Sequence, residues 1–106
     1  MPEAEPVVPT RLFLEAIARR VCVSTTYNRM AIKLAPHVLY TRHDELFVDG
    51  VTVEREGKKP KELKLGTFKL TGLSATELTR RLFVPQSLFD QSDPKYAGTT
   101  LLAVEA

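Results

Sequence analysis

Two histidines and one pair of adjacent carboxylates are the obvious candidates for catalysis or metal binding in this chain of 106 residues. His37 and His43 lie six positions apart on a strand-like segment, which is not a metal-ligand spacing, and no cluster of other ligands joins them. Asp44 and Glu45 fall between two strand-like segments, where a hairpin turn explains them better than acid–base catalysis. The sequence also lacks a nucleophile elbow, a P-loop and a dinucleotide-binding motif. We therefore expect a protein that is not an enzyme and that needs neither a metal nor a cofactor.

Basic side chains recur on one expected face of a sheet. The three cationic positions of one strand are four residues apart, so they point to the same side. Two lysines of a later strand should share that face, with a tyrosine nearby as a stacking surface. This composition is typical of an oligonucleotide or phosphate site, although an ordinary solvated sheet face is the alternative. The candidate ligand-binding residues are Tyr27, Arg29, Lys33, His37, Lys64 and Lys69.

The positive charge is concentrated in one segment. The net charge of +2 is too small to indicate a nucleic-acid partner, but residues 58–69 hold five lysines and one acid. Such a cluster predicts anion binding better than the mean charge does. Lysines that keep an exposed hairpin soluble are the alternative explanation.

Composition also limits the compartment. The hydrophobic content of 43% indicates a soluble globular protein, and the length indicates one domain. The single cysteine, Cys22, excludes an intrachain disulfide and lies in an apolar run, so we expect a buried thiol. No apolar run is long enough to span a membrane, and the acidic, proline-rich first residues do not resemble a signal peptide. These features predict a cytoplasmic location without membrane association.

Periodicity predicts a mainly β fold that begins with one helix. Apolar residues at helical spacing indicate a helix over 10–20. Four strand-like segments follow without helical crossovers, which excludes a parallel sheet and favours a small, open antiparallel barrel. Asp49 and Gly50 interrupt the third strand and indicate a bulge, with a tight turn as the alternative. The expected strands are 21–27, 29–42, 45–53 and 63–73.

The fourth strand contains a change of phase. Leu65 and Phe68 cannot share a face of a regular strand, because their spacing of three has the wrong parity. Gly66 lies at the break and predicts a β-bulge, although a glycine there also suits a close backbone approach. A bulge would direct Lys64 and Lys69 together to the polar face.

The chain after the fourth strand is expected to be helical and then extended. Ser74 and Glu77 have the spacing of a capping box, which predicts a short helix ending near Arg81. The residues at 99–106 have high β propensity and predict a last strand or a loosely held tail. The expected organisation is a flexible lead-in at 1–9, a domain at 10–90 and a C-terminal tail or extra strand at 91–106.

The order of these segments resembles the WYL domains of bacterial transcriptional regulators over roughly residues 12–90. The segments "VSTTYN", "IKLAPHVLY" and "GTFKLTGL" match a strand ending in Tyr, a basic strand running into Pro, and the last strand. "LTRRLFVPQSLFD" resembles the segment that usually follows in that family. Leu46, Phe47 and Val48 stand where the family has its name-giving Trp, Tyr and Leu.

The resemblance implies an Sm/SH3-like barrel that senses an anionic ligand, a nucleotide or single-stranded nucleic acid, in transcription regulation. Tyr27, Lys33 and Lys69 match family positions that hold tyrosine or basic residues, whereas Gly66 and Gly72 occupy two arginine positions.

Only about 20 residues precede the expected barrel, so we expect a stand-alone module or one that serves a DNA-binding regulator on another chain. The alternative is a protein-interaction or homodimerisation module with a degenerate ligand site.

Overall fold

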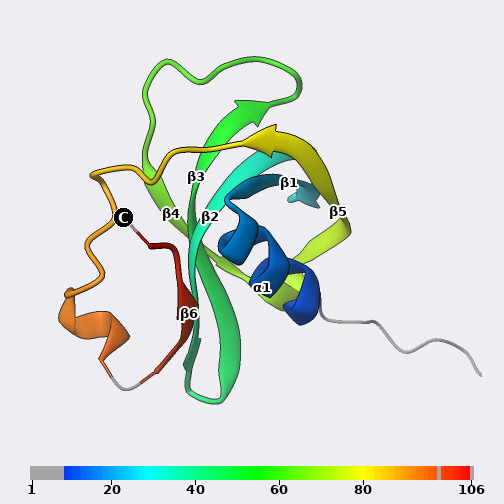
Figure 1. The fold of residues 1–106 in the computed structure, drawn as a ribbon. Helices are drawn as coiled ribbons and strands as arrows, with labels where there is room; N and C mark the ends of the chain where they lie inside the picture. Colours follow the sequence, from blue (N-terminus) through cyan, green and yellow to red (C-terminus); the bar gives the residue numbers. More distant parts are fainter. Residues whose placement is uncertain (1–8, 98, 106) are drawn as a thin grey trace, which may run out of the picture.

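The computed structural model describes residues 9–97 and 99–105 (Figure 1). The lead-in expected at 1–9 lies outside these residues apart from Pro9. None of the described helices is long and apolar enough to cross a membrane. In chain order the elements are α1 (Thr10–Arg19), β1 (Val21–Tyr27), β2 (Met30–Arg42), β3 (Glu45–Arg55), β4 (Leu65–Lys69), η1 (Leu70–Gly72), β5 (Leu73–Leu82), η2 (Pro94–Tyr96) and β6 (Thr100–Ala103).

The strands form one bent antiparallel sheet in the order β4-β3-β2-β1-β5. The long β2 pairs with β1 through its first half and with β6 through Val38–Tyr40. The strands β1 and β6 therefore lie along successive parts of the same edge of β2. The prediction of a mainly β, antiparallel fold with an N-terminal helix is confirmed. The sheet is not closed, because its two end strands do not pair with each other in the part described.

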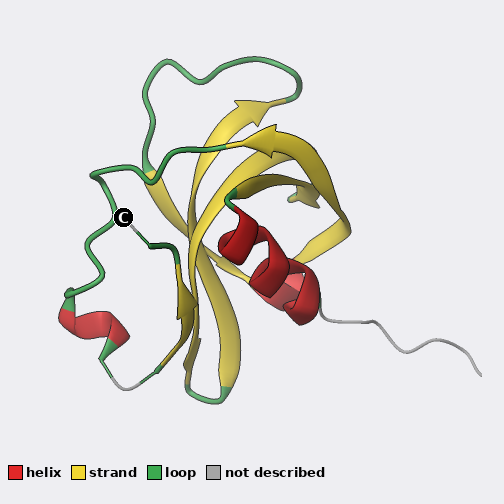
Figure 2. Cartoon of the chain, in the orientation of Figure 1, coloured by secondary structure: helices red, strands yellow, loops and turns green. Residues whose placement is uncertain are grey.

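One face of the sheet is covered by α1, as Figure 2 shows. Phe13, Ala16 and Ile17 are buried at the helical spacing that predicted this element. They pack in one cluster with inward residues of the central strands, including Leu34 and Val48. The helix ends at Arg19 and is capped by Arg20, whose left-handed conformation lets its N–H donate a hydrogen bond back to the last turn.

The opposite face is covered by the chain that follows β5. Phe83 packs there against a cluster that contains Cys22, and Phe89 and Tyr96 pack against Tyr40. Cys22 is buried as predicted. Because both faces of the sheet are covered, both parities of the central strands carry apolar residues.

This two-sided burial explains the phase change in β4, and the predicted bulge at Gly66 is wrong. The pairing of β4 with β3 is regular, with Gly66 opposite Gly50. Leu65 packs in the cluster of Cys22, whereas Phe68 packs on the helix-covered face. A Cβ on Gly66 would lie 3.3 Å from Cε1 of Phe68 and would meet no backbone atom of another residue within 4 Å beyond its chain neighbours, so the alternative of a close backbone approach at this glycine is also wrong.

The irregularity expected at Asp49 and Gly50 is present, but the extra residue is in the facing strand. Pro36 pairs with Gly50 and Val38 pairs with Asp49, so His37 is the bulged residue. The turn alternative is wrong because β3 continues through this point. A Cβ on Gly50 would lie only 2.7 Å from the Ala35 carbonyl oxygen, so the close approach of the two strands requires glycine.

The helix predicted after Ser74 is wrong, because this segment is the strand β5. Ser74 caps no helix; its carbonyl instead accepts a hydrogen bond from the Thr25 hydroxyl. The Thr79 hydroxyl donates to the Cys22 carbonyl across the same strand pair. Pairing with β1 therefore outweighs the local capping pattern. For the C-terminal residues, the alternative of an extra strand is correct, since β6 forms.

Candidate functional site

The six residues expected to form one basic face do not come together on one. His37 is fully buried, so the prediction that it shares an exposed polar face with Arg29 and Lys33 is wrong. Arg29 is exposed in the turn between β1 and β2, where its backbone has a positive φ. The bulge in β2 breaks the regular alternation on which the spacing argument depended.

His37 has a structural environment. Its Nδ1 lies 2.8 Å from the Ala35 carbonyl oxygen, and its Nε2 accepts a hydrogen bond from the Gln86 amide at 3.0 Å. The ring lies between Phe83 and Phe89. Burial lowers the pKa of His37, partly offset by its bond to the Ala35 carbonyl. A neutral imidazole with its proton on Nδ1 satisfies both contacts, so this side chain fastens the segment after β5 to the sheet.

Two of the expected lysines are paired with acids. Lys33 Nζ lies 3.7 Å from Glu54, which also contacts Arg81 at 2.8 Å. Lys69 pairs with Glu45 at the other end of β3. Each of these two lysines is therefore partly neutralised by an acid, and the two ion pairs lie at opposite ends of β3.

Of the remaining two residues, Lys64 lines a hollow that we name the β3–β4 hollow, whereas Tyr27 does not line it and instead contacts its lining residue Phe68. The hollow has a volume of about 400 Å³ and lies between the loop at 56–64 and the strands that this loop connects. Its lining residues are Thr52, Arg55, Pro60, Lys61, Glu62, Lys64, Gly66 and Phe68.

The hollow combines an apolar floor with a basic rim. Phe68 lies at its base, and the Tyr27 ring meets Phe68 edge-on at 5.1 Å between centroids. The rim cations Arg55, Lys61 and Lys64 are exposed, and none of them takes part in an ion pair within residues 9–97 and 99–105. Three cations face one acid there, which favours a negatively charged ligand.

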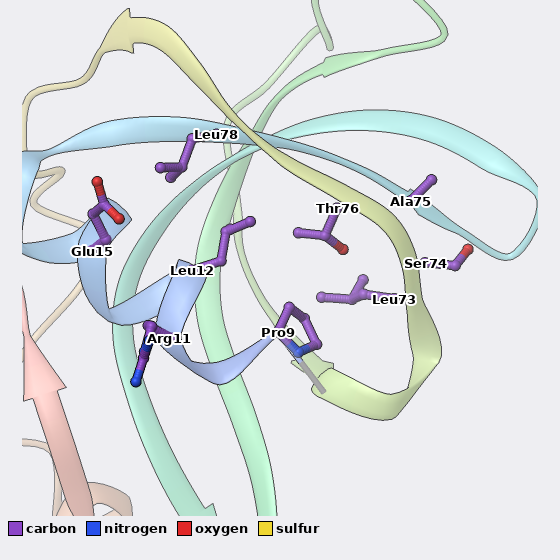
Figure 3. Close-up of a pocket in the computed structure, with 9 residues that line it drawn as sticks. All are labelled: Pro9, Arg11, Leu12, Glu15, Leu73, Ser74, Ala75, Thr76 and Leu78. Carbon is purple, nitrogen blue, oxygen red and sulfur yellow. The ribbon is translucent and has the colours of Figure 1, made fainter. Parts of the chain in front are cut away.

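A larger cavity, of about 510 Å³, lies between the start of α1 and β5 (Figure 3). Leu12, Leu73 and Leu78 supply its apolar surface, and Figure 3 shows Leu12 projecting toward β5. Its charged residues, Arg11 and Glu15, are of opposite sign. This cavity therefore lacks the excess of one charge that distinguishes the β3–β4 hollow.

A buried polar network around Asp49 was missed by the sequence analysis. Both Asp49 oxygens are engaged, one by the Tyr40 hydroxyl at 2.7 Å and the other by Tyr96 and by Lys95 at 2.8 Å. Burial opposes ionisation, but the hydrogen bonds from Lys95, Tyr96 and Tyr40 outweigh it and lower the pKa of Asp49. Burial and the bond to Asp49 raise the pKa of Tyr96.

This network joins β2 and β3 to the segment after β5, because the Asp49 carboxylate has partners at both oxygens. The only local sequence signal was an acid inside an apolar strand, and its partners Lys95 and Tyr96 are distant in the chain. Comparison of the chain with protein-family models, curated proteins and solved structures finds no match.

Proposed function

We propose that this protein is a non-catalytic module that binds an anionic ligand, a nucleotide or single-stranded nucleic acid, at the β3–β4 hollow. The observation that carries this proposal is the set of three cations, Arg55, Lys61 and Lys64, around an apolar floor. The hollow replaces the broad sheet face suggested by spacing, and Lys64 is the one member of the expected set that lines it.

Size and chemistry support the proposal. A volume of about 400 Å³ falls in the range of roughly 300–1,000 Å³ typical of small-ligand pockets. Lysine and arginine at the rim suit phosphate oxygens, and an aromatic floor suits the apolar part of a nucleoside. Gly66 contributes by leaving the space above Phe68 free of a side chain.

The resemblance to WYL domains supports the biological part of the proposal. That part has three features: an Sm/SH3-like arrangement of the bent sheet, a role in transcription regulation, and a DNA-binding regulator on another chain as the partner. These features follow from the order of the sequence segments, whereas the ligand class also has support from the charge of the hollow.

Fluorescence anisotropy with a labelled single-stranded oligonucleotide, and competition by ATP, test the ligand class. The variant Arg55→Ala/Lys61→Ala/Lys64→Ala should weaken oligonucleotide binding at least about tenfold, because phosphate contacts dominate such affinities. The matched control Arg11→Ala/Arg42→Ala/Arg80→Ala removes the same charge from exposed positions outside the hollow. Equal losses in both variants, or no binding by the wild type at low salt, would contradict the proposal.

A further inference from the structure

A second surface carries exposed aliphatic side chains around a groove, which we name the β5 groove. It lies where the loop at 56–64 approaches the end of β5, and its volume is about 440 Å³. In Figure 1 these two segments run near each other at the top of the molecule. Leu63, Leu82 and Val84 line the groove and are 41%, 70% and 73% exposed.

This clustering is unusual for an isolated folded chain. Five large hydrophobic side chains are exposed in the described residues, and three of them line this one groove. The base of the groove is also apolar, since Cys22, Val53 and Phe83 lie there. Contiguous exposed apolar surface with a polar rim is typical of a protein-docking site.

The rim of the groove is basic. Lys59 lines it without an ion pair in the part of the chain that the structure describes. Arg81 also lines the groove and forms an ion pair with Glu54. The neighbouring Lys58 and Arg80 are exposed as well. A partner segment should therefore carry acids beside its aliphatic residues.

We propose that the β5 groove docks an acidic, aliphatic segment of a partner protein. Its aliphatic side chains would cover Leu82 and Val84, and its carboxylates would meet the cations of the rim. This site is separate from the β3–β4 hollow and does not depend on the ligand proposed there.

Other occupants fit the surface less well. A second copy docked groove against groove would bring Lys59 and Arg81 of both copies into one interface, and these like charges would oppose the association. The pairing of β5 with β1 is also irregular at two points, and bulged edges resist edge-to-edge association. Nucleic acid would satisfy the cations but would leave Leu82 and Val84 without apolar partners.

Synthetic peptides of alternating Glu and Leu test this proposal by fluorescence anisotropy. Two matched peptides replace Glu with Lys or Leu with Ser, so each removes one of the two required properties. Only the Glu–Leu peptide should bind, and Leu82→Ser/Val84→Ser should weaken that binding at least about tenfold, because burial of apolar anchors dominates docking. The control Leu88→Ser/Leu101→Ser alters exposed leucines that do not line the groove and should bind normally. Lys59→Glu should weaken the Glu–Leu peptide and favour the Lys–Leu peptide.

Three results would overturn the proposal. The first is no binding of the Glu–Leu peptide, and the second is an equal loss in the Leu88/Leu101 control. The third is a wild-type dimer, seen by sedimentation, that dissociates in Leu82→Ser/Val84→Ser, because a second copy would then occupy the groove. Unchanged oligonucleotide binding by this variant would show that the two sites are independent.

Discussion

The hydroxyl of Tyr96 donates a hydrogen bond to the buried carboxylate of Asp49, at 2.5 Å and across 47 positions of sequence. Lys95 contacts the same oxygen and lies over the Tyr96 ring. This contact joins the segment after β5 to the middle of β3. With the bond between His37 and Gln86, it fixes a long irregular stretch of chain on the sheet.

Removing the Tyr96 hydroxyl should destabilise the fold. In Tyr96→Phe the Asp49 carboxylate stays buried with one donor fewer, so the free energy of unfolding should fall by about 1–3 kcal/mol. Urea unfolding monitored by circular dichroism measures the change. Tyr27→Phe is the matched control, since the Tyr27 hydroxyl makes no hydrogen bond within the described structure. A Tyr96→Phe protein as stable as this control would mean that the network contributes little.

The free energy of unfolding should decrease as the pH is lowered below about 6.5, the ordinary pKa of histidine. Burial lowers the pKa of His37, so between its folded and ordinary values the unfolded chain binds a proton that the folded chain does not. The His37 contribution is therefore complete above that window and is lost as the pH falls through it.

Urea midpoints measured from pH 8 to pH 5 should show this slope in the wild type. His37→Gln should flatten it, whereas His43→Gln, altered at an exposed turn, should keep it. Loss of the pH dependence in His43→Gln would show that His43, and not His37, causes it, and would contradict the prediction.

The glycines should differ sharply in their tolerance of alanine. Gly50→Ala places a methyl group 2.7 Å from a backbone oxygen of β2, so overpacking should cost about 1–3 kcal/mol or more. Gly72→Ala meets only the Tyr27 ring at 4.0 Å, and its stability should change little. Thermal unfolding of the two variants side by side gives the comparison. Comparable losses would show that the approach of β2 to β3 is not the constraint.

The Cys22 thiol should be protected in the native state. Burial raises its pKa, which reduces the thiolate that reacts with disulfide reagents. Labelling by such a reagent should be slow in buffer and should follow unfolding as urea is added. Rapid labelling under native conditions would show instead that the β5 groove opens to its base.

The sequence alone determined the elements whose signals are local. The apolar spacing around Phe13 and Ile17 predicted α1, and β-rich segments without crossovers predicted the antiparallel sheet. The cluster of lysines before β4 indicated a basic region, and two of its members, Lys61 and Lys64, line the β3–β4 hollow. Local patterns were sufficient here because each depends on residues close together in the chain.

Tertiary structure decided what depends on long-range contacts. The segment after Ser74 is compatible with a helix or a strand, and only its pairing with β1 selects the strand. Leu65 and Phe68 lie on opposite faces of a regular β4, without a bulge at Gly66, because both faces of the sheet are covered, which no single strand can reveal. His37 is buried rather than exposed because it is the bulged residue of β2 and because the distant Gln86 amide donates a hydrogen bond to its ring. In each case, partners far along the chain supply the free energy that chooses between locally similar alternatives.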